Sequence, residues 1–295
     1  MDDLVSTAWL ESRLGEPDLR VVAVPVRLYP DPALGAVTEA DEWAQAHIPG
    51  SVLADLPARL SDRTNPLPAM MPPAEEFAAA MEGLGVGDGT RVVLYDLGGN
   101  AWAARVWWML HAVGFDDAAI LDGGWRKWQL EGRPVSSDVT DPPAARFVVK
   151  EQRPVFVGTG DVQTALDDES ACIINALDAD QHSDKVRPAQ TWSELPTPGS
   201  FYGIRGHIPG TSNVPYLELV DPETTAYLPE DELRRRFETA LASERAVIYC
   251  GAGIAASSDA FLLRRLGQRN VAVYDGSLVE WFRDELPLVT EDVDG

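Results

Sequence analysis

The sequence predicts an α/β protein made of two tandem domains, each a mostly parallel sheet flanked by helices. Short apolar runs alternate with helical patterns along the whole chain, which is typical of this fold class. The landmarks of the first half return in the same order in the second half. A length of 295 residues is enough for two domains of ordinary size, each with its own core.

Three motifs carry the internal repeat. They pair Ala46-His47-Ile48-Pro49-Gly50 with Gly206-His207-Ile208-Pro209-Gly210, Arg91 to Asp96 with Ala246 to Cys250, and Leu121 to Trp128 with Tyr274 to Trp281. Their common order and wide spacing indicate duplication of a whole domain rather than a solenoid of short repeats. We expect an N-terminal domain over 1–138, a linker over 139–150 and a C-terminal domain over 151–295.

Each half contains apolar runs of strand length and longer stretches of helical periodicity. The expected strands are Arg20–Val24, Val92–Tyr95, Ala119–Leu121, Ala171–Asn175, Ala246–Tyr249 and Val271–Tyr274. The expected helices are Ala74–Leu84, Ala101–Val113, Glu230–Leu241 and Ala256–Leu266. Apolar strands that alternate with helices predict a parallel sheet, whose ligands bind at the carboxyl ends of the strands.

The composition excludes several classes of partner. The formal net charge of −23 argues against nucleic acid and anionic membrane surfaces. Two cysteines form no disulfide framework and suit a reducing compartment, and we expect a cytoplasmic protein. The N-terminus lacks the pattern of a signal peptide, and no apolar run is long enough to span a bilayer.

Cys250 is the strongest candidate for chemistry. It ends an apolar strand and precedes the loop Gly251-Ala252-Gly253, with Ile254, Ala255 and Ala256 leading into a helix. Backbone N–H groups and the positive end of a helix dipole favour a thiolate over a thiol at such a position. The glycines let the loop curl so that successive N–H groups face an anion. The loop therefore predicts a nucleophilic sulfur, or a charged group carried on it.

The second cysteine has a different setting. Cys172 lies inside the apolar run Ala171-Cys172-Ile173-Ile174. A cysteine in such a run packs as a small hydrophobic side chain. We expect Cys172 to be a core residue without a role in chemistry.

Together these motifs resemble the rhodanese superfamily, and within it the two-domain thiosulfate/3-mercaptopyruvate sulfurtransferases. The paired His-Ile-Pro-Gly motifs, the Asp-Gly-Gly and Asp-Gly-Ser motifs and the Cys250 loop carry the resemblance, which covers nearly the whole chain. It implies that only the C-terminal domain is catalytic, since Asp96 stands where the second half has Cys250.

The resemblance also implies the reaction. A thiolate takes the outer sulfur of a small donor, such as 3-mercaptopyruvate or thiosulfate, and becomes a persulfide. A thiol or cyanide-like acceptor, or a sulfur-accepting protein, then removes that sulfur. No metal and no organic cofactor is expected.

The candidate substrate-binding residues depart from the family pattern. The arginine that the family places after the strand of Cys172 aligns near Gln181, and Arg187 and Arg205 are the nearest basic substitutes. Both motif histidines suit a structural role, because the turn recurs in a half without the cysteine. His47 is the better candidate for a role in the cleft, where the resemblance places its turn. The departures imply either an unusual donor or weak activity on the standard donors.

Other functions remain open at this point. A specialised persulfide carrier would deliver sulfur to a protein or biosynthetic partner. A weakly active or non-catalytic interaction module would explain the missing arginines and loop hydroxyls. Phosphatase chemistry on this fold needs an arginine six residues after the cysteine, where this chain has Ala256. Retention of Cys250 with Gly251 and Gly253 favours the enzyme.

Overall fold

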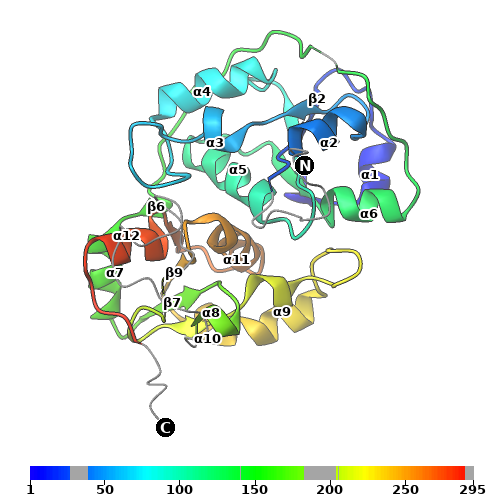
Figure 1. The fold of residues 1–295 in the computed structure, drawn as a ribbon. Coiled ribbons are helices and arrows are strands. Elements are labelled where there is room, and N and C mark those ends of the chain that lie inside the picture. The colour runs from blue at the N-terminus through cyan, green and yellow to red at the C-terminus, as the bar shows by residue number, and fades with distance from the viewer. Residues whose placement is uncertain (27–38, 140, 183–203, 205, 290–295) are drawn as a thin grey trace. The chain divides into compact units, whose positions relative to one another are not determined.

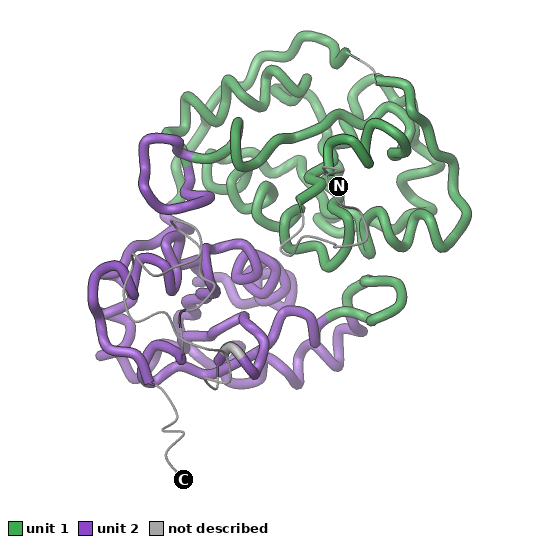
Figure 2. Tube along the Cα trace, in the orientation of Figure 1, with its two compact units in different colours: residues 1–61, 72–153, 220–227 green, residues 62–71, 154–219, 228–295 purple. Residues whose placement is uncertain are grey.

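The structure is a computed structural model that describes residues 1–26, 39–139, 141–182, 204 and 206–289 (Figure 1). The chain divides into two compact units (Figure 2). Unit 1 contains 1–61, 72–153 and 220–227, and unit 2 contains 62–71, 154–219 and 228–295. Each half of the chain therefore contributes one short segment to the other unit.

Each unit is built on a five-stranded sheet whose strand pairs are all parallel. In unit 1 the order is β1 (Leu4–Val5), β5 (Ala118–Leu121), β4 (Arg91–Tyr95), β2 (Leu19–Ala23) and β3 (Val52–Leu53). In unit 2 the order is β6 (Phe156–Val157), β10 (Val271–Tyr274), β9 (Arg245–Tyr249), β7 (Ala171–Asn175) and β8 (Ser212–Asn213). The two orders match strand for strand, which confirms the predicted repeat of an α/β domain.

Helices flank both sheets. In the first half these are α1 (Thr7–Glu11), α2 (Glu39–Gln45), α3 (Leu56–Arg59), α4 (Ala74–Gly83), α5 (Ala101–Ala112) and α6 (Gly124–Leu130). In the second half they are α7 (Thr159–Leu166), α8 (Ala179–His182), the 3-10 helix η2 (Tyr216–Leu219), α9 (Glu230–Arg236), α10 (Glu238–Ala242), α11 (Ile254–Arg265) and α12 (Ser277–Arg283). Helix α5 packs on β4 and β5, and α11 packs on β9 and β10 in the same way.

The core of unit 1 follows from strand periodicity. Alternate residues of a strand share one face of the sheet. One such face, with the helices over it, gives the buried cluster Val5, Leu10, Leu19, Val21, Ala23, Trp43, Ile48, Val93, Tyr95, Ala119, Leu121 and Trp128. The intervening residues Val22, Val92 and Leu94 are buried as well. Burial on both faces explains why these strands are continuously apolar rather than alternating.

Two expected helices differ in extent. The stretch expected as one helix over Glu230–Leu241 is two helices, because Phe237 leaves the helical conformation with φ −101° and ψ 16° and buries its ring. Helix α11 begins at Ile254, two residues before its expected start, because Gly253 completes the preceding turn in the left-handed conformation.

The segment after α6 runs along unit 1. The carbonyl oxygen of Arg146 accepts the N–H of Asp88 at 2.8 Å, and the N–H of Phe147 donates to the Glu82 carboxylate at 2.7 Å. A Cβ on Gly87 would lie 2.3 Å from the Arg146 carbonyl oxygen, so the close approach requires glycine there. The division into two compact units does not show where each duplicated copy begins and ends. The domain boundaries at 138 and 151 therefore stay a prediction.

Candidate active site

Cys250 follows the carboxyl end of the central strand β9, and residues 251–253 join it to α11. Figure 1 labels both elements. The thiol residue is buried, with 2% of its surface exposed. Loops at this edge of a parallel sheet form the usual ligand site of α/β proteins, because several strand ends meet there. The strand order places β7 and β10 on either side of β9, so their carboxyl ends flank the cysteine.

The hydroxyl of Ser277 supports the Cys250 loop from the neighbouring strand end. Its oxygen accepts the N–H groups of Cys250 and Gly253, each at 3.1 Å, and donates to the carbonyl oxygen of Tyr274 at 2.7 Å. A hydroxyl has one donor and two acceptor positions, so the three hydrogen bonds use the full hydrogen-bonding capacity of the Ser277 side chain. Two further backbone bonds join α12 to the loop, from Leu278 to the Cys250 carbonyl and from Val279 to the Gly251 carbonyl, each at 3.1 Å.

The remaining loop amides have no protein acceptor among the described residues. Residues of a first helical turn have no intrahelical acceptor for their N–H groups. Within the described residues, the N–H groups of Gly251, Ala252, Ile254, Ala255 and Ala256 donate to no protein acceptor. The Gly253 backbone has φ +76°, which closes the turn without a side-chain penalty. The N–H groups of Cys250 and Gly253, by contrast, are taken by Ser277.

In unit 1 the equivalent loop holds the carboxyl group of Asp96. Asp96 follows β4 as Cys250 follows β9, and its carboxylate is fully buried. One oxygen accepts the N–H groups of Gly98 and Asn100 at 3.0 and 3.2 Å. The other accepts those of Trp102 and Ala103 at 3.0 and 3.3 Å. Burial raises the pKa of Asp96, and these four N–H bonds counteract that rise.

The donors in unit 1 have equivalents in unit 2. Asn100 and Gly253 are both left-handed residues directly before the helix, with φ of +61° and +76°. Trp102 and Ala103 are therefore matched by Ala255 and Ala256. The amides of Trp102 and Ala103, which hold one oxygen of the Asp96 carboxylate, thus correspond to two amides without an acceptor in unit 2, whereas the amide equivalent to that of Asn100 donates to Ser277.

The first residue of the helix that follows the neighbouring strand also differs between the two units. It is Gly124 of α6 in unit 1 and Ser277 of α12 in unit 2. Gly124 and Ser277 are equivalent, with φ of +52° and +50°. A Cβ on Gly124 would lie 2.7 Å from the Asp96 carbonyl oxygen and 3.3 Å from its carboxylate, so a serine is excluded there. Unit 1 therefore combines a carboxylate with glycine, and unit 2 combines a thiol with serine.

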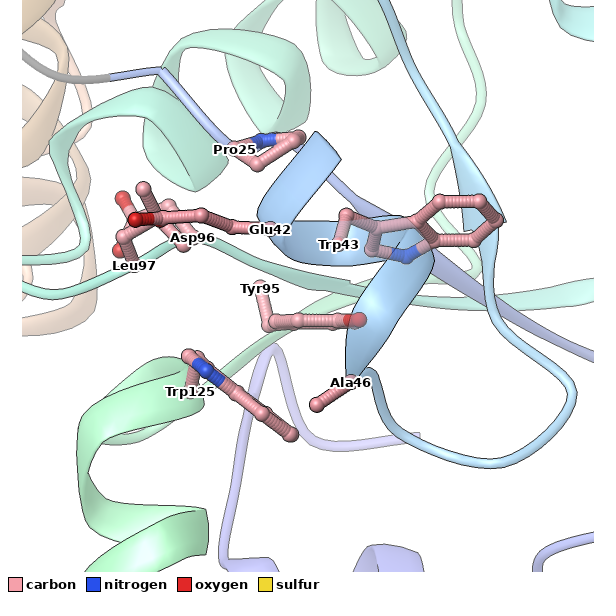
Figure 3. Close-up of a pocket in the computed structure, with 8 residues that line it drawn as sticks. All are labelled: Pro25, Glu42, Trp43, Ala46, Tyr95, Asp96, Leu97 and Trp125. Atoms are coloured by element: carbon pink, nitrogen blue, oxygen red, sulfur yellow. The ribbon is translucent and has the colours of Figure 1, made fainter. Parts of the chain in front are cut away.

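A small pocket in unit 1 lies beside Asp96 (Figure 3). It is lined by Pro25, Glu42, Trp43, Ala46, Tyr95, Asp96, Leu97 and Trp125. The rings of Tyr95 and Trp125 have centroids 6.4 Å apart. The carboxylate oxygens of Asp96 are taken by backbone amides, so this pocket has no nucleophile at the position of the cysteine.

The His-Ile-Pro-Gly turn of each unit is tied to the central strand by a tyrosine. In unit 2 the Tyr249 hydroxyl oxygen accepts the Ile208 N–H at 3.1 Å and lies 3.0 Å from the Thr211 hydroxyl. In unit 1 Tyr95 makes the same contacts with Ile48 and Ser51, at 3.4 and 2.9 Å. Burial raises the pKa of both tyrosines, that of Tyr95 to about 12, so both stay neutral at physiological pH.

The motif histidines are held through backbone carbonyls. His47 is fully buried, with Nδ1 2.7 Å from the Trp43 carbonyl oxygen and Nε2 3.2 Å from that of Asp138. Its ring stacks on Trp43 at 4.2 Å. His47 therefore has no exposed surface, and each ring nitrogen lies near a carbonyl oxygen. Its candidate role in binding substrate stays a prediction.

The equivalent stack in unit 2 is a pair of histidines. His207 Nδ1 donates to the His182 carbonyl oxygen at 3.0 Å, and the two rings stack at 3.9 Å. The Asn175 amide nitrogen donates to His182 Nδ1 at 3.0 Å, because its oxygen already accepts the Leu177 N–H. Burial, and then the charge of His207, lower the pKa of His182 to about 4. The position of Trp43 is therefore taken by a titratable ring in unit 2.

The remaining predicted residues have mixed outcomes. Arg187 and Arg205 lie outside the described residues, and so does the side chain of Gln181, whose backbone belongs to α8. Cys172 is buried within β7, as predicted, and burial raises the pKa of its thiol. Sequence reasoning missed Ser277, although its place in the repeated Asp-Gly-Ser motif next to the strand end could have indicated it.

The described residues contain neither a cluster of metal-binding side chains nor a membrane-spanning helix. No three side chains of His, Cys, Asp or Glu converge there as a metal-binding group would. No helix in that part of the chain has the length and apolar character needed to cross a membrane.

Comparison with known proteins identifies the family. The model of the rhodanese-like domain matches residues 6–131 and again 165–284. A 3-mercaptopyruvate sulfurtransferase of Escherichia coli is 33% identical over 290 residues, which cover 96% of each chain. The human 3-mercaptopyruvate sulfurtransferase is 34% identical, over 96% of this chain and 93% of its own.

Solved structures agree with the sequence matches. The crystal structure of SseA from Escherichia coli, described as a 3-mercaptopyruvate sulfotransferase with the rhodanese fold, superposes with a TM-score of 0.78. It is 31% identical and is matched over 94% of this chain and 99% of its own. Tum1 of Saccharomyces cerevisiae, at 24% identity and a TM-score of 0.79, shares the fold. The chain belongs to the rhodanese-like family and carries one rhodanese-like domain in each half.

Proposed function

We propose that this protein is a sulfurtransferase in which Cys250 carries the transferred sulfur as a persulfide. The family match and the full-length relatives named as sulfurtransferases support sulfur transfer. The observation that carries the assignment to Cys250 is the Asp96 carboxylate of unit 1. Its oxygens accept four N–H groups of the loop, and two of the equivalent amides in unit 2, those of Ala255 and Ala256, have no acceptor in the described structure.

The reaction follows from a thiolate held in such a loop. The Cys250 thiolate attacks the outer sulfur of the donor, and an S–S bond forms. The bond from that sulfur to the rest of the donor breaks, and the leaving group takes the electron pair, as sulfite from thiosulfate or as the pyruvate enolate from 3-mercaptopyruvate. The acceptor, a thiolate or cyanide, then attacks the outer sulfur, and Cys250 leaves again as the thiolate.

The loop amides stabilise both charged states of the sulfur. We assign this role to Gly251, Ala252, Ile254, Ala255 and Ala256, whose N–H groups have no other acceptor in the described structure. Preorganised amides of this kind stabilise an anion without reorganisation during the reaction. Gly253 contributes the turn itself, because its own N–H is held by Ser277.

The composition of the loop next to Cys250 bears on the choice of sulfur donor. Gly251 and Ala252 offer no positive charge next to the sulfur, and the chain as a whole carries −23. A dianion such as thiosulfate gains little there, so we propose 3-mercaptopyruvate as the better of the two standard donors. Arg187 and Arg205 stay the candidates for contact with its carboxylate. Both cysteines are unpaired, which supports the proposed cytoplasmic location.

Intact-mass measurement tests the proposal. The protein is incubated separately with 3-mercaptopyruvate and with thiosulfate, and its mass is measured before and after addition of cyanide. Gain of one sulfur at Cys250, removed by cyanide, is the expected result. Cys250→Ser should gain none, because oxygen cannot form the persulfide, whereas the matched Cys172→Ser variant should behave as the wild type.

Two outcomes would favour the alternatives. A persulfide that forms but transfers poorly to cyanide and small thiols would indicate a carrier that serves a protein acceptor. Absence of any sulfur gain with a folded wild-type protein would indicate a non-catalytic interaction module and would reject the mechanism.

A further inference from the structure

Two adjoining hollows of unit 1 lie at the carboxyl end of its central strand β4. The inner hollow is the pocket beside Asp96 (Figure 3), and the outer hollow shares Glu42, Leu97 and Trp125 with it. The outer hollow adds the polar side chains of Gln45, Arg126 and Gln129. Counted with the space open to solvent, the inner hollow holds about 260 Å³ and the outer one about 820 Å³. The site therefore has a narrow inner end and a wider mouth.

Two aromatic rings line the inner hollow. The rings of Tyr95 and Trp125 are inclined at 37° to each other, and Trp125 is partly exposed and lines both hollows. Tyr95 is fixed in place, because it is buried and its hydroxyl lies 2.9 Å from that of Ser51. The π face of an aromatic ring carries negative partial charge and attracts a cation. A rigid wall of this kind binds a ligand without first having to be ordered.

Two carboxyl groups line the same inner hollow. The Glu42 side chain extends from α2 toward the residues that follow β4 (Figure 3). Among the described residues, the oxygens of Asp96 accept only backbone N–H groups. A protonated Asp96 would direct its O–H at donors alone, so these bonds hold the group as a carboxylate. The described lining of the inner hollow contains no basic side chain, so its charge is negative.

The equivalent strand end of unit 2 has the opposite electrostatic character. Cys250 stands there in place of Asp96, next to loop amides without an acceptor in the described structure. The ring is replaced as well, because Leu278 follows Ser277 as Trp125 follows Gly124, and Leu278 is buried. Unit 2 thus offers N–H donors to an anion, whereas unit 1 offers a π face and carboxylates to a cation.

We propose that unit 1 binds a small organic cation, whose ammonium group enters the inner hollow between the Trp125 ring and the Glu42 carboxylate while its body lies in the outer hollow. The narrow inner end suits a primary ammonium group better than a bulky quaternary one. The net charge of −23 favours a cation over an anion at any open site of the chain. The site lies wholly within unit 1 and is separate from the sulfur chemistry proposed for Cys250.

Arg126 sets a limit on the body of the ligand. It lines the outer hollow but not the inner one. Its Nε donates to the Glu223 carbonyl oxygen at 2.5 Å, and its Nη2 donates to that of Pro222 at 3.5 Å. A second cationic group at the mouth would be repelled by this guanidinium. The site therefore favours a cation with one ammonium group and a neutral or acidic body.

A pair of matched probes tests for a cation site. Butylammonium and 1-butanol have nearly the same shape, but only butylammonium is charged at neutral pH. Each is titrated at constant ionic strength into the Cys250→Ser protein, and the indole N–H signal of Trp125 is followed by NMR. We expect that signal to shift, with a Kd for butylammonium at least about tenfold below that for 1-butanol. Because Cys250→Ser cannot form a persulfide, the result is distinct from the success or failure of sulfur transfer.

Substitutions in the lining test the two residues that would hold the ammonium group. Glu42→Gln should raise the Kd for butylammonium about fivefold, as measured by NMR signals of the ligand. Trp125→Leu, which introduces the residue of unit 2, should raise it about tenfold, and Trp125→Phe, which keeps a ring, should raise it less. Circular dichroism checks that each variant is folded.

The matched control lies on the same helix as Glu42. Asp41 is exposed and lines neither hollow, so Asp41→Asn removes one negative charge and should leave the Kd within about twofold. Three results would each overturn the inference. They are the absence of a shift in the Trp125 signal, equal Kd values for the two probes, and a Kd for butylammonium that is unchanged in the folded Glu42→Gln and Trp125→Leu variants.

Discussion

The hydroxyl of Ser277 accepts the backbone N–H of Cys250 at 3.1 Å, so a residue from the start of α12 fixes the backbone at the thiol. The same oxygen accepts the Gly253 N–H across the loop. Ser277 is fully buried and has φ +50°, a conformation that costs energy for a residue with a side chain. Glycine, which occupies the equivalent position of unit 1, would avoid that cost but would remove the hydroxyl.

Removal of this hydroxyl should impair sulfur transfer. In Ser277→Ala two buried N–H groups lose their acceptor, at a cost of about 1–3 kcal/mol in the free energy of unfolding. A loop without this support holds the sulfur less well, and we expect kcat to fall about tenfold or more. Steady-state kinetics with 3-mercaptopyruvate and urea unfolding measure the two effects.

Two further variants separate the hydroxyl from the backbone and from general stability. Ser277→Gly relieves the left-handed conformation but still lacks the hydroxyl, and its kcat should fall as in Ser277→Ala. Ser51→Ala removes a buried hydroxyl from unit 1, where it contacts Tyr95, and should lower stability with kcat retained. Full activity in Ser277→Gly would show that the loop does not depend on this hydrogen bond.

Gly253 should tolerate asparagine far better than valine. The residue has φ +76°, which a β-branched side chain cannot adopt without strain, so Gly253→Val should lose nearly all persulfide formation. Asn100 occupies the equivalent position of unit 1 with φ +61°, and Gly253→Asn should therefore keep most of the activity. Sulfur gain by mass, with circular dichroism as a check of folding, compares the variants. Equal loss in both would mean that the requirement is for space and not for conformation.

Much of the fold could be predicted from local pattern. The six central strands begin and end within one residue of their expected limits, because buried parallel strands are continuous apolar runs. The edge strands β1, β3, β6 and β8 have two residues each and offer no periodicity to detect. The break at Phe237 was equally hidden, because an apolar residue at helical spacing looks the same whether the helix continues or turns.

The cysteine of the candidate site could be predicted from local sequence, but its contacts with residues distant in the chain could not. Cys250 and its loop stand in one run of sequence, and so does the contrast with Asp96. The support from Ser277 and the hydrogen bond from the Met71 N–H to the Asp275 carboxylate join residues that are distant in the chain. The exchange of residues 62–71 and 220–227 between the two units follows from tertiary packing, which a repeat in the sequence does not reveal.

Asp96 should matter for the stability of unit 1 and not for sulfur transfer. In Asp96→Asn one acceptor oxygen becomes an NH2 group that faces backbone N–H donors, at a cost of about 1–3 kcal/mol. Hydrogen exchange at the amides of Trp102 and Ala103 should accelerate, while sulfur gain at Cys250 stays at the wild-type level. The exposed Asp117→Asn is the control and should change neither measurement. Loss of persulfide formation in Asp96→Asn would show that unit 1 contributes to the chemistry through this loop.

His182 should make the stability of the protein depend on pH between about 4 and 6.5. Burial, and then the charge of His207, lower its pKa to about 4, whereas the unfolded chain titrates near 6.5. The unfolded state therefore binds the proton more tightly, and the stabilisation present above pH 6.5 is lost as the pH falls toward 4. His182→Phe keeps a ring for the stack on His207 but cannot titrate, so its urea midpoint should fall less between pH 7 and pH 5 than that of the wild type. Trp43→Phe changes the equivalent ring of unit 1 and should retain the full wild-type fall. An identical fall in His182→Phe and the wild type would show that another group is responsible.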